Sequence, residues 1–178
     1  MPLRIGQKVA YPSQGVCKVE QIEQKIVGSS ERSFYSLRVL NDNSIIFVPL
    51  ENADSVGIRP VITQIQCKKL IAELSDDFEP VSNEWKTRSK CFAEQLQSGD
   101  VFKAAEVLKK LTFLSREKKL SFREQNLLEK SKFLIVSEIT NANKVDEEEL
   151  RAEIDRLIDI ACNRHSHHQP KVMSAAVH

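Results

Sequence analysis

The sequence of 178 residues has no long apolar run, and no stretch approaches the roughly 18 apolar residues that a membrane-spanning helix needs. The first residues, Met1 to Lys8, lack the apolar core of a secretory signal peptide. A hydrophobic fraction of 41% and a charged fraction of 29% are typical of a globular chain rather than a disordered one. We therefore expect a cytoplasmic protein without a membrane partner.

The sequence also has few groups suited to a metal site. The four cysteines, at positions 17, 67, 91 and 162, include no pair with the C-x-x-C spacing of a zinc knuckle or a redox motif. The run from His165 to His168 could chelate a metal weakly, but such a run more often belongs to a flexible tail. We expect reduced thiols, no metal and no cofactor.

The residues of common catalytic arrangements are missing as well. All four histidines lie in the final 14 residues, so the part expected to fold cannot contain a Ser-His-Asp or Cys-His pair. The five glycines form neither a G-x-G-x-x-G motif nor a P-loop. The sequence therefore predicts that the protein is not an enzyme.

What is present begins with short strands in residues 1–62. Residues 12–15, Pro-Ser-Gln-Gly, predict a tight turn after a first strand, and Ile45 to Val48 form a strand that ends at Pro49. The apolar residues of the second strand change from odd to even positions between Val19 and Ile22, which predicts a β-bulge. Four or five short strands with a bulge favour a small Tudor-like or SH3-like barrel.

The apolar period becomes helical after residue 62. Residues 63–82 read as a connecting helix and linker, residues 83–163 as a helical domain, and residues 164–178 as a flexible tail. Gly99 predicts a helix end, and Ser121 with Glu124 has the spacing of a capping box. The predicted fold is therefore α+β and multidomain, with a Tudor/SH3-like β barrel followed by an all-α domain.

The formal net charge of +1 conceals an uneven distribution. Residues 1–77 sum to zero, residues 83–134 to +5 and residues 135–164 to −4. A basic face on a helical module suits phosphate binding, although lysines are also common on solvated helix surfaces. The charge pattern alone leaves both interpretations open.

The single tryptophan, Trp85, begins the basic segment. It lies seven and eleven residues before Phe92 and Leu96, a spacing that can form a core stripe along a helix. It is also followed closely by three cations, an arrangement in which the ring could stack on a base while the cations hold phosphates. The sequence does not decide between these two roles.

Two series of short motifs run along the chain in a fixed order. The first is Gly6-x-x-Val9-x-Tyr11-Pro12-x-x-Gly15-Val16-x-x-Val19-x-x-Ile22-Glu23, followed by Val48-Pro49 and Val56-Gly57-Ile58-Arg59. The second comprises Trp85-x-x-Arg88, Gly99-Asp100, Ala105-Glu106-Val107, Leu120-Ser121-x-x-Glu124 and Leu134-Ile135-Val136-Ser137-Glu138. Over roughly residues 3–140, their order and spacing resemble the CarD/CdnL family of bacterial transcription regulators.

The resemblance implies a Tudor-like domain that binds the β subunit of bacterial RNA polymerase and a helical domain that contacts promoter DNA at the upstream edge of the bubble, largely without reading its sequence. It implies stabilisation of the open complex by a monomer that associates with the nucleoid through polymerase. The implied polymerase-binding residues are Lys25, Ile45, Ile46, Phe47, Val48 and Pro49. The implied DNA-binding residues are Trp85 as a minor-groove wedge, Lys86, Arg88 and Lys90 on flanking phosphates, and Lys109 and Arg116 as weaker contacts.

Two alternatives stay open at this stage. The chain could be a polymerase-binding adaptor whose basic helices never touch DNA. It could instead be a Tudor-like module that holds a methylated side chain in an aromatic cage, for which Tyr11, Phe34, Tyr35 and Phe47 are available.

Overall fold

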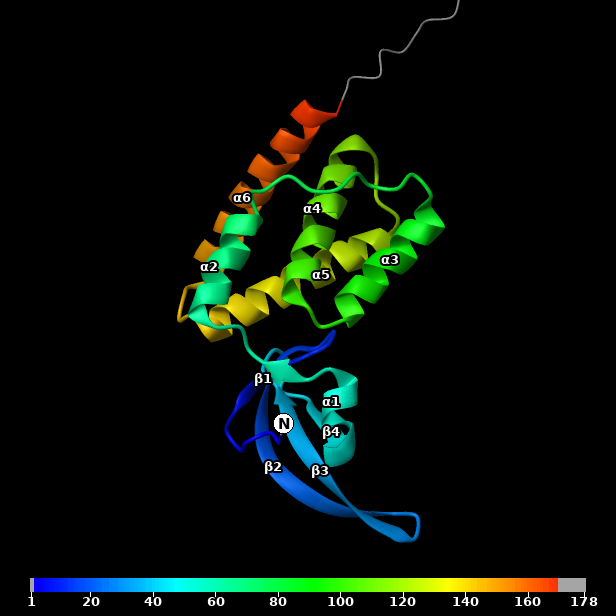
Figure 1. The fold of residues 1–178 in the computed structure, drawn as a ribbon, viewed down its shortest axis with the longest axis vertical. Helices are drawn as coiled ribbons and strands as arrows, with labels where there is room; N and C mark the ends of the chain where they lie inside the picture. Colours follow the sequence, from blue (N-terminus) through cyan, green and yellow to red (C-terminus); the bar gives the residue numbers. More distant parts are fainter. Residues whose placement is uncertain (1, 170–178) are drawn as a thin grey trace, which may run out of the picture.

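A sheet domain and a helical domain make up the protein, whose computed structural model describes residues 2–169 (Figure 1). The sheet domain has five antiparallel strands in the order β4-β3-β2-β1-β5, so β4 and β5 are its two edges. The strands are β1 (Lys8–Tyr11), β2 (Gly15–Val27), β3 (Ser30–Val39), β4 (Ile45–Pro49) and β5 (Arg59–Pro60).

The predicted bulge in the second strand is confirmed. The pairing of β2 with β3 shifts register between Val19 and Gln21, so Val19 lies opposite Leu37 and Ile22 lies opposite Tyr35. Such a bulge bends a strand and increases its twist. Beyond it, β2 and β3 extend past the core as a long curved hairpin, on which Ile26 is 80% exposed (Figure 1).

The sheet domain has a small core of its own. A 3-10 turn, η1 (Leu50–Asn52), and a single-turn helix, α1 (Ala53–Val56), follow β4 and help to close it. Neither was predicted, because one helical turn is too short to show a 3.6-residue period. The core residues are Val9, Cys17, Val19, Tyr35, Leu37, Val39, Val48, Ala53 and Ile58.

Five helices form the rest of the described chain, and local side-chain caps begin most of them. They are α2 (Gln64–Glu73), α3 (Trp85–Gln97), α4 (Val101–Glu117), α5 (Phe122–Ala142) and α6 (Glu147–His168). Ser121 and Glu124 form the predicted capping box of α5, and Asp100 and Asp146 cap α4 and α6. The predicted fold class, a Tudor-like β domain followed by an all-α domain, is confirmed, and the five strands of the expected barrel form an open sheet with β4 and β5 as its edges.

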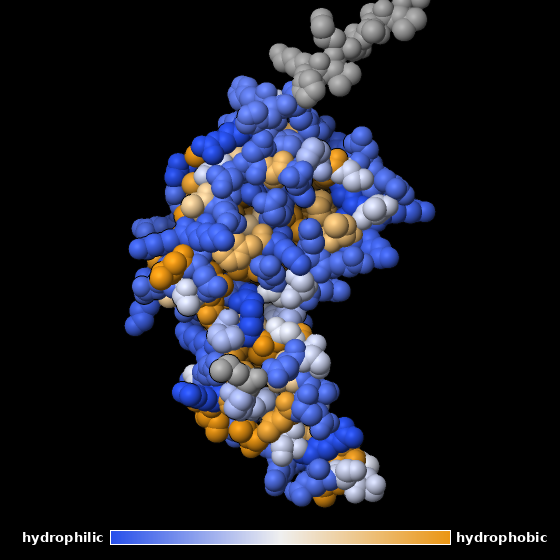
Figure 2. Space-filling view, viewed as in Figure 1, coloured by the Kyte–Doolittle hydropathy of each residue, from blue (hydrophilic) through white to orange (hydrophobic). Residues whose placement is uncertain are grey.

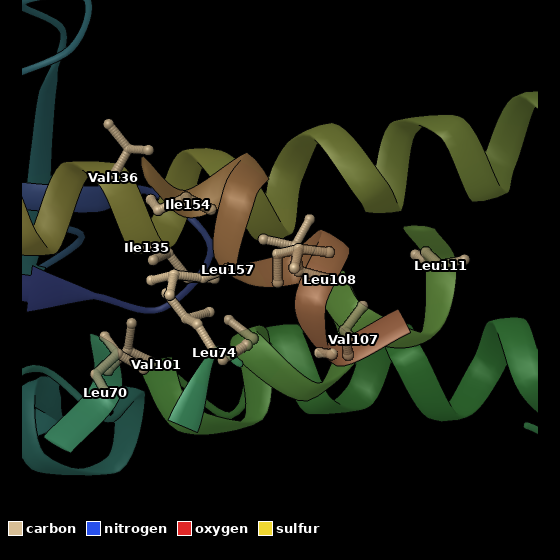
Figure 3. Close-up of a cluster of buried hydrophobic side chains, with 14 of the residues drawn as sticks. Leu70, Leu74, Val101, Val107, Leu108, Leu111, Ile135, Val136, Ile154 and Leu157 are labelled. Carbon is tan, nitrogen blue, oxygen red and sulfur yellow. The ribbon is translucent and has the colours of Figure 1, made fainter. Parts of the chain in front are cut away.

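The second helix belongs to the helical core rather than only connecting the two domains. Leu70 of α2 and Leu74, which caps its C-terminal end, are completely buried (Figure 3). They belong to the cluster that α4, α5 and α6 complete with residues such as Leu111, Ile135 and Ile154. The segment expected to be a connecting helix and linker therefore contributes apolar contacts that stabilise the helical domain.

The predicted start of a tail at residue 164 is wrong, because α6 continues to His168. His165 is buried, its ring stacks on Phe78 at a centroid distance of 4.0 Å, and its Nδ1 lies 2.7 Å from a carboxylate oxygen of Asp77. Three histidines, at positions 165, 167 and 168, therefore lie in the last turn of α6, and His165 is the buried one. The remainder of the expected tail, residues 170–178, is outside the described residues.

The two domains meet where the β1–β2 turn lies against α5. Gly15, at the start of β2, has a φ of +84°, and a Cβ added there would lie 3.0 Å from Ser137 Oγ and 3.1 Å from Phe133 Cζ. Only glycine suits both this backbone conformation and this close approach. Val16 adds a hydrogen bond from its backbone N–H to Ser137 Oγ at 3.2 Å.

Candidate functional site

The edge strand β4 contains five of the residues implied in polymerase binding. It pairs with β3 along one side only, so its other side presents backbone groups that can accept a further strand. Its side chains alternate between two faces: Ile45 and Phe47 are 45% and 42% exposed, whereas Val48 is buried in the sheet core and Ile46 packs against that core. Only the outward-facing residues are therefore available to a partner through their side chains.

Lys25 and Phe47 lie together on the outer face of the sheet, although β3 separates their strands. The Lys25 Nζ lies 3.2 Å from the centroid of the Phe47 ring, a cation–π contact, and 3.5 Å from a carboxylate oxygen of Glu23. At exposed positions such a contact contributes about 0.5–1 kcal/mol. The structure thus brings two of the expected polymerase-binding residues into one cationic and aromatic spot beside an open sheet edge.

The sheet domain exposes more large apolar side chains than the helical domain. Within residues 2–169, eleven such side chains are exposed and seven of them belong to the sheet domain, namely Ile5, Ile22, Ile26, Val27, Ile45, Phe47 and Leu50. Figure 2 shows hydrophobic surface on both domains and hydrophilic surface at the outer end of the helical domain. Exposed apolar residues that gather on one part of a surface commonly mark a protein contact. The sheet domain is therefore the better candidate for binding a protein.

The four aromatic residues proposed for a methyl-binding cage do not gather at one place. Tyr35 is buried in the sheet core, where its hydroxyl accepts a hydrogen bond from the Leu3 N–H at 3.1 Å. Phe34 precedes it in the same strand and so faces the opposite side. Tyr11 lies on β1, two strands away from β3. Within residues 2–169, the sheet domain has no ring-to-ring contact that could begin a cage.

Trp85 is the first residue of α3 and is 57% exposed. The core-stripe interpretation of this residue is wrong: Phe92 and Leu96 are buried, but the ring of Trp85 lies outside the core they enter. The Lys86 Nζ is 5.7 Å from the centroid of the indole ring. An exposed indole with a cation beside it is a suitable platform for a nucleobase and its phosphate.

Arg88 does not lie on this surface, which corrects its expected role. Its side chain is only 2% exposed and forms a buried ion pair with Glu124 of α5, in which Nε donates to Oε1 at 3.0 Å and Nη2 donates to the same oxygen. Its Nη1 donates to the backbone carbonyl of Ser82 at 2.8 Å. Arg88 therefore fixes the start of α3 against the start of α5 and is not placed to hold a phosphate.

Lys109 is buried too, and its expected contact with DNA is corrected in the same way. Its side chain is 1% exposed, and its Nζ lies 2.9 Å from the carbonyl oxygen of Glu73, 3.3 Å from that of Asp76 and 2.7 Å from a carboxylate oxygen of Glu106. These three acceptors match the three protons of an ammonium group. Lys109 therefore holds the C-terminal end of α2 on α4.

The acidic last helix pairs with part of the basic surface. Arg116 of α4 forms an ion pair with Asp159 of α6, and Lys132 of α5 lies 2.6 Å from Asp155 of α6. Lys90 is more exposed than Arg116 and Lys132, and its Nζ makes only a long contact, at 4.0 Å, with a carboxylate oxygen of Glu94 on its own helix. Of the cations expected to contact DNA, Lys86 and Lys90 are thus the most accessible, and α6 competes for Arg116.

A group of exposed cations that sequence reasoning did not select lies around the α4–α5 turn. It comprises Lys118 and Lys119 in the turn and Arg123 in the first turn of α5, and none of them forms an ion pair with another residue of the described range 2–169. The signal in the sequence was the density of basic residues between positions 116 and 123. The net charge of residues 83–134 includes these three residues but does not show that they lie together at the surface.

Arg59 forms a second link between the two domains, besides the contact of the β1–β2 turn with α5. This residue of β5 donates from Nη2 to Glu138 Oε2 of α5 at 2.8 Å, and from Nε and Nη2 to the carbonyl of Gly99 at 3.0 and 2.6 Å. Glu138 also accepts a hydrogen bond from the Ile62 N–H at 3.0 Å. The β4 edge and Trp85 are therefore carried on one connected framework.

Within the part of the chain that the structure describes, no three His, Cys, Asp or Glu side chains are grouped closely enough to hold a metal ion. No helix among these residues is long and apolar enough to cross a membrane.

The fold and these two surfaces define a two-domain binding protein, and comparison with known families gives its class. Residues 3–62 match the CarD-like/TRCF RID domain, a domain type that interacts with RNA polymerase, and residues 69–155 match the CarD C-terminal domain. The two matches follow each other with only residues 63–68 between them. The chain belongs to the CarD family of transcription regulators.

The chain is also similar to two individual proteins. The "Putative transcription factor YdeB" of Bacillus subtilis (strain 168) is 27% identical over 154 residues, which cover 84% of this chain and 97% of that protein. The solution structure of the 72-residue N-terminal domain of Myxococcus xanthus CarD is 34% identical, with a TM-score of 0.29, and covers 33% of this chain and 79% of that one.

Proposed function

We propose that this chain binds the β subunit of bacterial RNA polymerase and stabilises the promoter open complex through contacts of its helical domain with DNA. Family membership supports the regulatory role. The observation that carries the DNA part is the exposure of Trp85, the only tryptophan, at the start of a helix and beside Lys86. An indole that packed in the core would have favoured a different function.

The polymerase contact is assigned to the β4 edge and the Lys25–Phe47 spot. Main-chain hydrogen bonds to a strand of the β subunit would extend the sheet, and the outward side chains of Ile45 and Phe47 would select the partner. Lys25 supplies a positive charge at the same place. Val48 contributes by holding β4 on the sheet core rather than by touching the partner.

The DNA contact is assigned to Trp85 with Lys86 and Lys90. Opening a duplex breaks base stacking at the edge of the bubble, at a cost of about a few kcal/mol for each step. A ring inserted into the minor groove at that step replaces part of the lost stacking, while the two lysines hold flanking phosphates without reading sequence.

Tethering makes a weak DNA contact sufficient. Once the sheet domain is bound to polymerase, the helical domain is held near the promoter at a high effective concentration. The Arg59–Glu138 contact keeps Trp85 at a fixed place relative to β4. Because the wedge has a site only where the strands have separated, it favours the open complex over the closed one.

The decisive experiment measures the lifetime of open complexes after addition of a competitor, with wild type and Trp85→Ala. We expect the variant to lose most of the stabilisation while still being retained by polymerase in a pull-down. Ile65→Ala is the matched control, since Ile65 is 81% exposed on α2 and belongs to neither surface. A folded Trp85→Ala protein that prolongs the lifetime as wild type does would contradict the wedge.

A test of the other surface uses Phe47→Ala together with Lys25→Ala. We expect this double variant to lose retention by polymerase, because it removes the ring and the charge of one contact spot. Ile65→Ala again serves as the control. Unchanged retention of the β subunit by the folded double variant would refute the assignment to β4.

The adaptor without DNA contact is a second candidate, and one observation favours it. Two of the six residues expected to contact DNA, Arg88 and Lys109, are buried, and Arg116 is paired with Asp159. The two functions differ in their salt dependence. Stabilisation of open complexes that is unaffected by Lys86→Ala and Lys90→Ala across a range of salt concentrations would support the adaptor.

A further inference from the structure

Phe122, which begins α5, is 79% exposed and has no role in the function proposed above. A single exposed aromatic residue needs no explanation, because most surfaces carry some apolar side chains. Trp85, at 57%, is a second exposed aromatic residue of the same domain. The two residues are the first of α5 and α3, and these two helices begin on the same side of the helical domain (Figure 1).

The buried Arg88–Glu124 pair shows why the two rings share one end of the domain. Arg88 lies one helical turn after Trp85, and Glu124 lies two residues after Phe122. Glu124 also accepts hydrogen bonds from the backbone N–H and the hydroxyl of Ser121, both at 3.1 Å. One carboxylate thus fixes the first turn of α5 against the first turn of α3, and the two exposed rings extend from these turns.

Positive charge surrounds these rings. Lys118 and Lys119 precede Phe122, Arg123 follows it, and Lys86 follows Trp85; all four are exposed and form no ion pair within residues 2–169. Two acidic residues reduce this positive charge without cancelling it: Glu84 precedes Trp85, and Glu117 precedes Lys118. A polyanion with exposed flat rings matches this combination of aromatic faces and cations.

We infer that Phe122 is a second nucleic-acid contact, which stacks on an unpaired base of the promoter bubble next to the step occupied by Trp85. Lys118, Lys119 and Arg123 would hold the phosphates of the same strand. This inference rests on the proposed function, since it needs the helical domain to lie at the edge of the bubble. The Phe122 contact would add a single-stranded base to the step held by Trp85, so the helical domain would hold both the edge of the bubble and the first unpaired nucleotide.

The position of the cations favours nucleic acid over an apolar protein partner. Lysine is depleted at protein interfaces, and two of the three cations near Phe122 in the sequence, Lys118 and Lys119, are lysines. On a nucleic acid, the same groups release counterions and bind phosphates directly. The three cations lie within five residues of Phe122, so ring and charges would act on the same ligand.

The experiment uses the full chain with RNA polymerase on a promoter that carries 2-aminopurine at the first unpaired upstream position. Open-complex lifetime and 2-aminopurine fluorescence are measured for wild type, Phe122→Ala, Phe122→Leu, Phe122→Tyr and Trp85→Ala. Loss of one base–aromatic stack corresponds to a decrease of about tenfold in stability of the complex. Ile65→Ala is the control for removal of an exposed apolar side chain elsewhere.

We expect Phe122→Ala and Phe122→Leu to shorten the lifetime by about tenfold and to reduce quenching of 2-aminopurine, with Phe122→Tyr close to wild type. A wild-type lifetime for Phe122→Ala, with a defect in Trp85→Ala, overturns the inference and leaves the proposed function intact. Wild-type behaviour of both alanine variants overturns the two together. If polymerase without promoter DNA retains less of the Phe122→Ala protein than of wild type, Phe122 contacts a protein and the inference is overturned.

Discussion

Arg59 on β5 and Glu138 on α5 form an ion pair that joins the sheet domain to the helical domain. The carboxylate is only 5% exposed, and besides Arg59 it accepts a hydrogen bond from the N–H of Ile62. The guanidinium also donates twice to the carbonyl of Gly99, which ends α3. Arg59 of the shortest strand thus connects three chain segments, namely β5, α5 and the turn between α3 and α4.

The first prediction concerns this junction. Arg59→Ala leaves the Glu138 carboxylate buried without its charge partner, so we expect the free energy of unfolding to decrease by about 2–3 kcal/mol. This is less than for a fully buried pair, because the Arg59 side chain is 30% exposed. Urea denaturation measures the change. Arg32→Ala, which breaks an exposed pair with Glu51, should cost at most about 1 kcal/mol, and equal effects would contradict the prediction.

The second prediction separates structural cations from surface ones. We expect Arg88→Ala to lower the free energy of unfolding by about 3–5 kcal/mol, because Glu124 would remain buried and unpaired. Lys90→Ala, on the same helix and exposed, should change stability by no more than about 0.5 kcal/mol. Urea denaturation of the two variants side by side tests this. A stable Arg88→Ala protein would show that the buried pair does not hold α3 on α5.

The third prediction follows from the acidity of Glu124. Burial alone would raise its pKa, but hydrogen bonds from Arg88 and Ser121 and the charge of Arg88 hold the pKa below its ordinary value of 4.5. A depressed pKa in the folded state contributes stability that is present above pH 4.5 and lost as the pH falls through the folded-state value. Wild type should therefore lose stability on acidification more steeply than Glu124→Gln.

Urea midpoints at intervals between neutral pH and about pH 3 measure this dependence, which spans the ordinary range of a glutamate. We expect the stability difference between wild type and Glu124→Gln to be largest at neutral pH and to shrink on acidification. Glu148→Gln, at an exposed position in α6, should retain the wild-type slope. A difference that stays constant with pH would show that Glu124 acts through packing rather than charge.

The fourth prediction concerns the cysteines. Cys17, Cys67 and Cys162 are buried, and Cys91 is exposed. Burial raises the pKa of Cys17 to about 11, so its thiolate is scarce at neutral pH. In the native protein we expect one thiol to react rapidly with an aromatic disulfide reagent and three to react only on unfolding. Cys91→Ser should abolish the rapid phase, and a persisting rapid phase would mean that another thiol becomes accessible.

The sequence was sufficient for the elements whose signals are local. Alternation and a change of parity predicted the strands and the bulge near Val19, and the capping box at Ser121 predicted the start of α5. The burial of Arg88 and Lys109 could not be predicted, because each depends on a partner 36 residues away, on another helix or at its end. A basic residue within a basic segment is expected at the surface unless that partner is known.

Trp85 is the opposite case, an apolar residue that the sequence alone could not assign to the surface. Its spacing to Phe92 and Leu96 is compatible with a core stripe, and whether the stripe reaches the first turn depends on where the neighbouring helices end. The net charge of residues 83–134 includes the exposed cations near Phe122, but a net charge does not say where each charged side chain lies. Residue contacts between helices were needed to assign each charge to the core, to α6 or to solvent.

The last prediction tests whether the acidic helix α6 weakens DNA binding. Asp159 forms an ion pair with Arg116, whose side chain is 39% exposed and otherwise suited to a phosphate contact. Asp159→Asn should release this guanidinium, so we expect longer-lived open complexes and a salt dependence of DNA binding that is steeper by about one ion. The free energy of unfolding should change by at most about 1 kcal/mol, because the pair is exposed.

Glu148→Gln removes the same charge in the first turn of α6, eleven residues before Asp159, and controls for a general change in net charge. Equal effects of Asp159→Asn and Glu148→Gln would assign the result to overall charge. A longer lifetime with Asp159→Asn that disappears in the double variant with Arg116→Ala would identify Arg116 as a DNA contact that α6 restrains.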